Sequence, residues 1–347
     1  MPDFQHKVLA WFDKHGRHEL PWQQQPTPYR VWISEIMLQQ TQVNTVIPYF
    51  QRFMQRFPEV RALAAARVDE VLHLWSGLGY YSRARNLHRC AAILERDCQG
   101  VFPRTVEELE RLPGIGRSTA GAILSLSMNL PCAVLDGNIK RVLCRYFGIE
   151  GWPGQGAVEK RLWQLAQGLL VEQRPAAYTQ AMMDLGALVC VRGNPRCAGC
   201  PVSADCAAYR QGRQQTLPHS RPRRPLPVKQ LQFIMIEAGN GDIMLQRRPP
   251  SGIWGGLWGF PECPLQEDAV SWVREQFGYR VSTVATEPVV KHSFTHFQLQ
   301  ATPVRLKLKS AAPGIRDRDD LYWFRPGGDN KILGMAAPVK KLVEKLA

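Results

Sequence analysis

The chain has 347 residues, with 44 Lys and Arg against 30 Asp and Glu, and a formal net charge of +14. This length allows two domains with separate cores, and the positive charge favours a polyanionic partner such as nucleic acid. No apolar run approaches the ~20 residues of a membrane span, so we expect no membrane segment. The N-terminus is amphipathic rather than signal-like, and nine cysteines without a secretion signal favour a metal or cluster over disulfides.

The apolar pattern divides the chain into three parts. Residues 1–210 repeat apolar positions every three or four residues, which predicts an all-helical domain. Residues 211–229 are rich in Pro and Arg and predict a stiff basic linker outside any core. Residues 230–347 predict an α+β domain. Within it we expect strands at 231–236, 242–246 and 303–308, and helices at 267–277 and 337–346.

The helical segment over 31–43 places one carboxylate, Glu35, among apolar residues. An acid in such surroundings loses solvation, which raises its pKa and suits a general acid near neutral pH. The alternative is a surface glutamate on an amphipathic helix.

The segment Leu112–Val142 opens with Leu-Pro-Gly-Ile-Gly and predicts a helix beginning near Arg117. Gly114 and Gly116 permit positive φ and leave backbone N–H groups open, and the helix N-terminus adds partial positive charge, so the turn suits a phosphate. Asp136 follows among apolar and small residues. A phosphate-binding turn that leads to an isolated acid suits chemistry on a nucleic-acid sugar. The alternative is an ordinary interhelix turn followed by a helix cap.

Four cysteines lie in the spacing C-x6-C-x2-C-x5-C, namely Cys190, Cys197, Cys200 and Cys206. Four thiolates so close in the chain can hold one inorganic centre. Both tetrahedral zinc and a [4Fe–4S] cube accept four thiolates, and the spacing physics alone does not separate them.

These motifs together resemble the adenine DNA glycosylases of the MutY type, within the endonuclease III or helix-hairpin-helix superfamily. The resemblance rests on Trp-Ile-Ser-Glu-Ile-Met-Leu-Gln-Gln-Thr-Gln at 32–42, on the Gly114–Gly116 turn and on the cysteine spacing, and it covers nearly the whole chain. It implies a helix-hairpin-helix catalytic domain over 1–210, with the hairpin at about 108–128 and the cluster loop at 190–206. A linker at 211–229 and a Nudix-like domain over 230–347 follow. The four cysteines would hold a [4Fe–4S] cluster, with zinc as the alternative.

The resemblance also implies a substrate and a role for each site residue. The substrate would be adenine opposite 8-oxoguanine or guanine in double-stranded DNA. Glu35 would protonate adenine N7, and Asp136, helped by Asn138, would stabilise or trap the C1′ cation, the pair of carboxylates that glycosidic cleavage uses. The adenine pocket falls on Leu20, Trp22 and Arg30; the residues that intercalate fall on Gln39 and Tyr80; the phosphate turn is Gly114 and Gly116. We expect a monomer in the bacterial cytoplasm, bound to the nucleoid through DNA.

Ser118 occupies the hairpin position where bifunctional relatives carry a lysine that attacks C1′. A hydroxyl cannot form a Schiff base, so we expect a monofunctional glycosylase. Lys140 is the lysine nearest to Asp136 in sequence, and residual lyase activity through it is the alternative.

The segment Arg247–Pro261 is rich in glycine and aromatic residues and resembles the Nudix-like domain of this family. One glutamate stands at 271–278 where a Mg²⁺-dependent Nudix hydrolase needs two or three, so we expect no pyrophosphatase activity. The domain would instead read the base opposite adenine through Ser293, Thr295 and His296. Family members commonly carry Phe-Ser-His where this chain has Phe-Thr-His.

Three other functions compete with this interpretation. A bifunctional glycosylase for oxidised pyrimidines is disfavoured by Ser118 and by the added C-terminal domain. A DNA-binding iron–sulfur redox sensor would need neither Glu35 nor Asp136, and a Nudix nucleotide hydrolase would need more glutamates.

Overall fold

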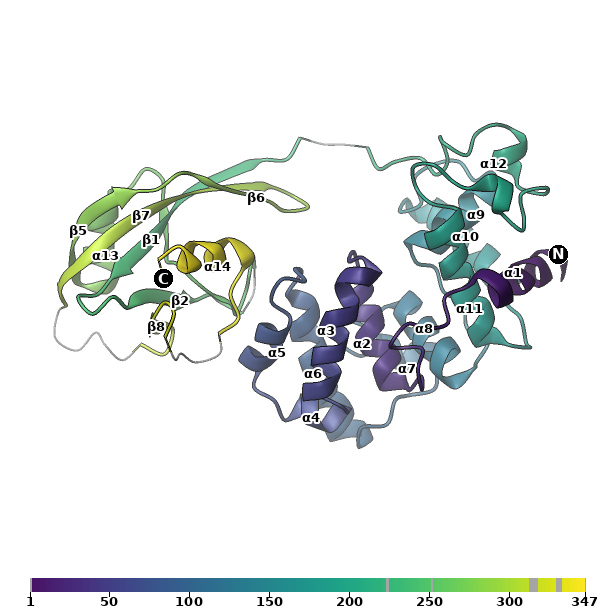
Figure 1. Ribbon diagram of the computed structural model, residues 1–347, viewed down its shortest axis with the longest axis horizontal. Helices are drawn as coiled ribbons and strands as arrows, with labels where there is room; N and C mark the ends of the chain where they lie inside the picture. The colour runs from purple at the N-terminus through teal and green to yellow at the C-terminus, as the bar shows by residue number, and fades with distance from the viewer. Residues whose placement is uncertain (1, 223–224, 251, 312–317, 329–332, 347) are drawn as a thin grey trace. The chain divides into compact units, whose positions relative to one another are not determined.

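The computed structural model describes residues 2–222, 225–250, 252–311, 318–328 and 333–346. The chain forms two compact units (Figure 1). The first contains Met1–Ala65 and Asn86–Arg223, and the second contains Ala66–Arg85 and Arg224–Ala347. Among the described residues, no helix is long and apolar enough to cross a membrane.

The helices of the chain are α1 (Pro2–His15), α2 (Pro28–Leu38), α3 (Val43–Arg56), α4 (Val60–Ala64), α5 (Val68–Leu74), α6 (Ser82–Cys98), α7 (Val106–Glu110), α8 (Arg117–Met128), α9 (Gly137–Tyr146), α10 (Gly156–Gly168), α11 (Pro175–Asp184), the π-helix η1 (Leu185–Val189), the 3-10 helix η2 (Cys197–Gly199), α12 (Ala207–Arg210), α13 (Ala269–Phe277) and α14 (Ala337–Glu344). The strands are β1 (Val228–Glu237), β2 (Ile243–Arg247), β3 (Trp258–Gly259), β4 (Glu262–Pro264), β5 (Tyr279–Thr286), β6 (Val290–Ser293), β7 (Gln298–Ala311) and β8 (Leu321–Phe324).

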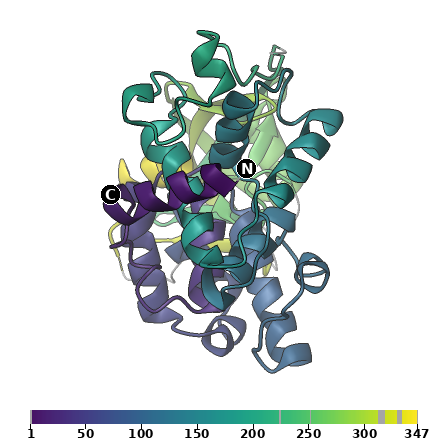
Figure 2. The ribbon, with the colours of Figure 1, turned by 90° about the vertical axis from the view of Figure 1, so that its right-hand side faces the viewer.

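The first unit is built from helices throughout its described residues, as predicted. α2 begins after Thr27, whose hydroxyl accepts the N–H of Arg30, and Pro28 occupies the first turn, where its missing N–H is harmless. α2 packs against α8. α1, the purple helix next to the N label in Figure 2, packs against α11. Since α7 and α8 flank the glycine turn, the predicted hairpin is confirmed, including a helix that begins at Arg117.

The second unit contains a mixed sheet with the strand order β3-β2-β1-β7-β5. β1 and β7 run parallel, whereas β4, β6 and β8 pair antiparallel with β1, β7 and β2. α13 packs on the sheet through Val273 and Phe277, which share a core with Ile234 and Leu306. The predicted strands and the two predicted C-terminal helices are all present, with ends that differ by a few residues.

The predicted linker is not free of the core along its whole length. Leu217 is 1% exposed, and its carbonyl accepts a hydrogen bond from the buried Arg145 at 2.8 Å. The guanidinium of Arg221 lies 5.3 Å from the ring centre of Trp152. The prolines made this stretch resemble a spacer, but one leucine and a buried arginine hold its first half on the helical unit.

Candidate active site

Glu35 is half-buried on α2, between the buried residues Ser34 and Ile36. Burial, with a smaller contribution from the negative charge of Asp136, raises the pKa of Glu35 to about 8. The carboxyl group is therefore protonated at neutral pH, as a general acid must be. The expected rise in pKa is confirmed, and the role of Glu35 stays a prediction.

Asp136 is the N-cap of α9, so the alternative of a helix cap describes its position correctly. One carboxylate oxygen accepts the N–H of Ile139 at 2.7 Å, and the other accepts Nδ2 of Asn138 at 3.1 Å. Burial raises the pKa of Asp136, while these hydrogen bonds oppose the rise. Capping and chemistry are compatible here, because the cap fixes a buried carboxylate within electrostatic range of Glu35.

Two glycines let the surrounding helices approach the Asp136 segment closely. A Cβ on Gly121 of α8 would lie 2.2 Å from the carbonyl oxygen of Ala133. A Cβ on Gly186 of η1 would lie 2.6 Å from the Cβ of Asn138. Both distances are too short for a real contact, so side chains at these positions would push the segment out of place. The π-helical turn at Gly186 is of a kind that is frequent at functional sites.

Ser118 lies in the first turn of α8 and accepts the N–H of Leu135 at 3.1 Å. The hydroxyl thus ties the hairpin to the residue before Asp136. A protonated lysine has no acceptor and could not make this bond.

A second set of bonds connects Asn138 with the cysteine loop. Nη2 of Arg141 donates to Oδ1 of Asn138 at 2.9 Å and to the carbonyl of Gly186 at 2.7 Å. Nε of Arg141 donates to the carbonyl of Cys190 at 2.6 Å. The amide of Asn138 is therefore oriented from both ends, since its nitrogen faces Asp136 and its oxygen faces Arg141.

A cavity of about 220 Å³ lies in the helical unit, and Trp22, Ser34 and Gln180 are among its lining residues. Nε2 of Gln180 donates to Oδ1 of Asp184 at 2.9 Å. Because a carboxylate only accepts, the amide nitrogen of Gln180 and not its oxygen must face Asp184. Asp184 is fully buried and also binds the backbone N–H of Arg17 at 2.7 Å.

Sequence reasoning missed Gln180 because it lies far from Glu35 in the chain and belongs to no local motif. Of the predicted pocket residues, Trp22 lines the cavity, whereas Leu20 and Arg30 do not. Arg30 instead donates to the carbonyl of Pro21 at 2.7 Å, next to Trp22. Arg30 therefore holds the segment that carries the tryptophan.

The glycine turn and the predicted intercalating residues have distinct backbone conformations. Gly114 has φ of +82°, whereas Gly116 is extended and is the N-cap of α8, with no side-chain cap. The expectation of positive φ thus holds for Gly114 only. Gln39 follows the last residue of α2, and Tyr80 is 44% exposed with φ of +48°. Gln39 belongs to the first compact unit and Tyr80 to the second.

The four cysteines of the predicted cluster loop line one cavity of about 30 Å³. Burial, with a contribution from the neighbouring thiols, raises the pKa of Cys200 to about 11. Nη1 of Arg145 donates to Sγ of Cys190 at 3.3 Å. As the described side chains stand, no three His, Cys, Asp or Glu groups are arranged to hold a single metal ion. The donor set, four thiols around one cavity, fits a thiolate-bound centre.

Ser293, Thr295 and His296 are exposed at the tip of the hairpin formed by β6 and β7. The N–H of Phe294 donates to the carbonyl of Phe297 at 2.9 Å and closes the tip. The structure therefore brings the three predicted residues together on one projecting turn.

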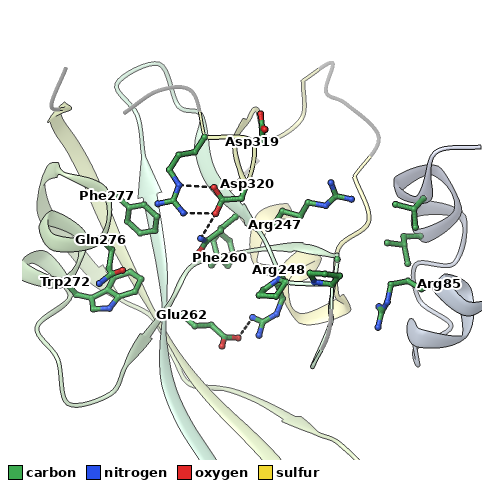
Figure 3. A pocket seen from close by; sticks show the side chains of 17 residues that line it. Arg85, Arg247, Arg248, Phe260, Glu262, Trp272, Gln276, Phe277, Asp319 and Asp320 are labelled. Carbon is green, nitrogen blue, oxygen red and sulfur yellow. Dashed lines mark hydrogen bonds and ion pairs between the residues drawn. The ribbon is translucent and has the colours of Figure 1, made fainter. Parts of the chain in front are cut away.

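A cavity of about 870 Å³ in the second unit is lined partly by α13 (Figure 3). α13 contributes Trp272 and Gln276 to its wall, whereas Glu275, the glutamate of this helix, is not among the lining residues. Three carboxylates also line the cavity, Glu262, Asp319 and Asp320. Glu262 is paired with Arg248, and Asp320 is bonded to Arg318 at 2.8 and 2.9 Å. An indole and an amide offer no carboxylate to Mg²⁺ from this helix, and the expected lack of pyrophosphatase activity stays a prediction.

Comparison with known proteins identifies both parts of the chain. Residues 33–167 match the family of HhH-GPD superfamily base excision DNA repair proteins, and residues 232–345 match the NUDIX domain. The adenine DNA glycosylase of Buchnera aphidicola (subsp. Acyrthosiphon pisum) is 38% identical over 98% of this chain and 97% of its own length. The rat adenine DNA glycosylase is 36% identical over 92% of this chain and 73% of its own length.

Solved structures share the fold of the helical part of the chain. A thermostable thymine-DNA glycosylase is 27% identical, with a TM-score of 0.54, and the match covers 60% of this chain and 95% of that one. Endonuclease III in a non-covalent DNA complex, at 20% identity and a TM-score of 0.51, covers 60% of this chain and 94% of that one and shares the fold. The predicted family and the two-domain fold are thus confirmed. The chain belongs to the adenine DNA glycosylase family of helix-hairpin-helix base-excision repair proteins.

Proposed function

We propose that this chain hydrolyses the N-glycosidic bond of adenine mispaired with 8-oxoguanine or guanine in duplex DNA. The chain is an adenine DNA glycosylase, a hydrolase of base-excision repair that acts on N-glycosyl bonds, and DNA is its partner. The observation that carries the finer proposal is a protonated Glu35 within electrostatic range of the half-buried Asp136, the N-cap of α9.

Adenine presents a ring-nitrogen acceptor at N7 and an amino donor at N6, whereas guanine presents two acceptors on the same edge. A protonated Glu35 would be a donor for N7, and the amide oxygen of Gln180 would be an acceptor for the N6 amino group. Gln180 lines the cavity of about 220 Å³; Glu35 is not among its lining residues, although the preceding residue, Ser34, is. Asp184 fixes the orientation of the Gln180 amide, because it can bind only the nitrogen. This donor–acceptor pair matches adenine and would leave two acceptors facing each other for guanine.

The reaction begins when the base is extruded from the duplex, at an unstacking cost of roughly a few kcal/mol. The proton of Glu35 moves to N7, which weakens the bond between N9 and C1′. Asp136 then stabilises the cation at C1′ electrostatically or through a transient covalent bond, and water completes the hydrolysis. Asn138 donates to Asp136 at 3.1 Å and holds the carboxylate in place.

The reaction should stop at base removal. Ser118 provides a hydroxyl that is bonded to the backbone of Leu135 and cannot form a Schiff base with C1′. Lys140 is bonded to Glu159 at 2.6 Å, which directs its amine away from lyase chemistry. We therefore propose a monofunctional enzyme.

DNA would dock through three surfaces, and the chain would act as a monomer. Backbone phosphates would bind the Gly114–Gly116 turn, where the start of α8 has no side-chain cap. Gln39 and Tyr80 would fill the gap that the base leaves, and the β6–β7 hairpin tip would contact the base opposite adenine.

The superfamily to which this chain belongs generally carries a [4Fe–4S] cluster, and we propose that the four cysteines hold one here. The cluster would supply a rigid inorganic centre for the loop. Arg141 and Arg145, through their bonds to Cys190, would hold this loop against α9. Iron and acid-labile sulfide measured in the purified protein should reach four each per chain. One zinc per chain instead would favour the alternative.

The test is a labelled duplex with a single adenine opposite 8-oxoguanine, incubated with the protein and then divided. We expect a nick only in the aliquot treated with hot alkali, and none in a cytosine:8-oxoguanine control. A nick without alkali would contradict the monofunctional assignment. Glu35→Gln and Asp136→Asn should each abolish excision while duplex binding persists, and retained turnover in either variant would refute the roles given to these carboxylates.

A further inference from the structure

Trp254 has φ of +52°, a conformation that a bulky residue rarely adopts, yet it is only 9% exposed. Holding a non-glycine residue in this region is unfavourable, because its Cβ crowds the following carbonyl oxygen. Such a conformation persists only where the surrounding structure fixes it. The position of Trp254 therefore needs an explanation beyond the turn that contains it.

The backbone around Trp254 is held from several directions. Nε of Arg248 donates to the carbonyl of Ile253 at 2.8 Å, and Arg248 is itself paired with Glu262. The N–H of Leu257 donates to the carbonyl of Trp254 at 3.0 Å. These bonds fix the backbone on both sides of the tryptophan and thereby determine where its indole lies.

The indole lies against the β6–β7 hairpin. Its ring centre is 5.4 Å from that of His292 and 5.3 Å from that of Phe294. Phe294 in turn stacks on Phe297, with centres 4.5 Å apart and an angle of 14° between the rings. The inner side of the hairpin tip therefore rests on Trp254 through an aromatic cluster.

The side chains of the tip alternate in exposure. His292 and Phe294 are half-buried on the side of Trp254, whereas Ser293 and Thr295 are exposed. This alternation follows from the strand period of two. A change in the indole that supports one side must shift or loosen the polar groups on the other.

We propose that Trp254 is a positioning residue that fixes the hairpin tip for contact with the base opposite adenine. The inference rests on the proposed function, in which Ser293, Thr295 and His296 make that contact. Trp254 would set the preference for 8-oxoguanine over guanine without touching the excised base.

Two substitutions separate the ring from the backbone. Trp254→Gly removes the indole but accepts positive φ without strain, so the turn should survive. Trp254→Phe keeps an aromatic ring against His292 and Phe294. Trp272→Ala is the matched control, because Trp272 contacts Phe277 rather than the hairpin.

The measurement is the single-turnover rate of adenine excision from duplexes with A:8-oxoguanine and A:G. For Trp254→Gly we expect the ratio of the two rates to fall at least tenfold, with the A:G rate within twofold of wild type. Trp254→Phe and Trp272→Ala should keep the ratio within threefold of wild type. Amide hydrogen exchange of the free full chain should accelerate at residues 293–297 in Trp254→Gly and stay unchanged in the β1–β7 ladder.

The possible results separate a wrong role for Trp254 from a wrong proposed function. If the wild-type protein does not excise adenine from either duplex, the proposed function is wrong. If it excises adenine with a preference that Trp254→Gly retains, the role of Trp254 is wrong. Equal losses for Trp254→Gly and Trp272→Ala, or rates that fall together on both duplexes, would likewise overturn a positioning role. Unchanged exchange at the tip would overturn it independently of activity.

Discussion

A single half-buried carboxyl group illustrates how the site derives its chemistry from its surroundings. Glu35 is neutral at pH 7 because desolvation, more than the charge of Asp136, opposes its ionisation. Asp136 experiences the same desolvation, but three hydrogen bonds from the start of α9 and from Asn138 oppose it. Two identical functional groups thus differ in the balance between desolvation and hydrogen bonding, which is the basis for the different roles proposed for them.

The pKa of about 8 for Glu35 predicts how the excision rate depends on pH. The single-turnover rate should be highest just below that pKa and fall about tenfold per pH unit well above it, because only the protonated acid can donate to N7. A rate profile for the wild type tests this, with the exposed Glu19→Gln as the control that should leave it unchanged. A rate that rises through pH 8 would contradict the general-acid role.

The raised pKa of Glu35 also predicts how the folding stability of the protein depends on pH. The pKa of Glu35 is higher in the folded protein than its ordinary value of 4.5, so the folded state binds the extra proton between pH 4.5 and about 8. Stability must therefore fall as pH rises through this window and level off above it. Glu35→Gln removes this loss, so its melting temperature should exceed the wild type by roughly 2–4 °C above pH 8 for each kcal/mol recovered. A variant less stable than wild type at that pH would contradict the burial argument.

At the scale of elements, the turn between α7 and α8 depends more on Gly114 than on Gly116. A Cβ on Gly114 would lie 2.8 Å from the Cβ of Asn86 and would also require positive φ. A Cβ on Gly116 would meet nothing within 4 Å. Gly114→Ala should therefore displace the turn and lower duplex affinity about tenfold, whereas Gly116→Ala should change it less than threefold. Fluorescence titration with a labelled duplex measures both, and equal effects would show that backbone conformation is not what the turn contributes.

Local patterns predicted the elements well. The start of α8 and the strands β1, β2 and β7 followed from Gly, Pro and apolar spacing, because these signals act within a few residues. The partners of the site did not follow, since Gln180 reaches the cavity only after α11 packs against α8. Trp254 was visible only as part of a glycine-rich aromatic run, and its contact with Phe294 depends on the sheet.

At the scale of the whole molecule, the connection between the units begins inside the helical core. Arg145 is 2% exposed and donates five hydrogen bonds, to Leu217, Arg192, Val191 and, twice, Cys190. The carbonyl of Leu217 belongs to the linker, and the other acceptors belong to the cysteine loop. One guanidinium thus fastens the start of the linker to the loop that the cluster would occupy.

This arrangement predicts that losing Arg145 loosens the linker and the loop together. Arg145→Met would leave several buried carbonyls without a donor, which should lower stability by about 3–5 kcal/mol. Limited proteolysis of the native full chain should then cleave within 213–221 about tenfold faster, since cleavage follows the population of locally open states. If the cysteines hold the proposed iron–sulfur cluster, its visible absorbance should fall in parallel. Arg161→Met, at an exposed position of α10, is the control that should alter neither readout. If the linker of Arg145→Met resists cleavage as the wild type does, then Leu217 is held by its own burial and the arginine serves the cysteine loop alone.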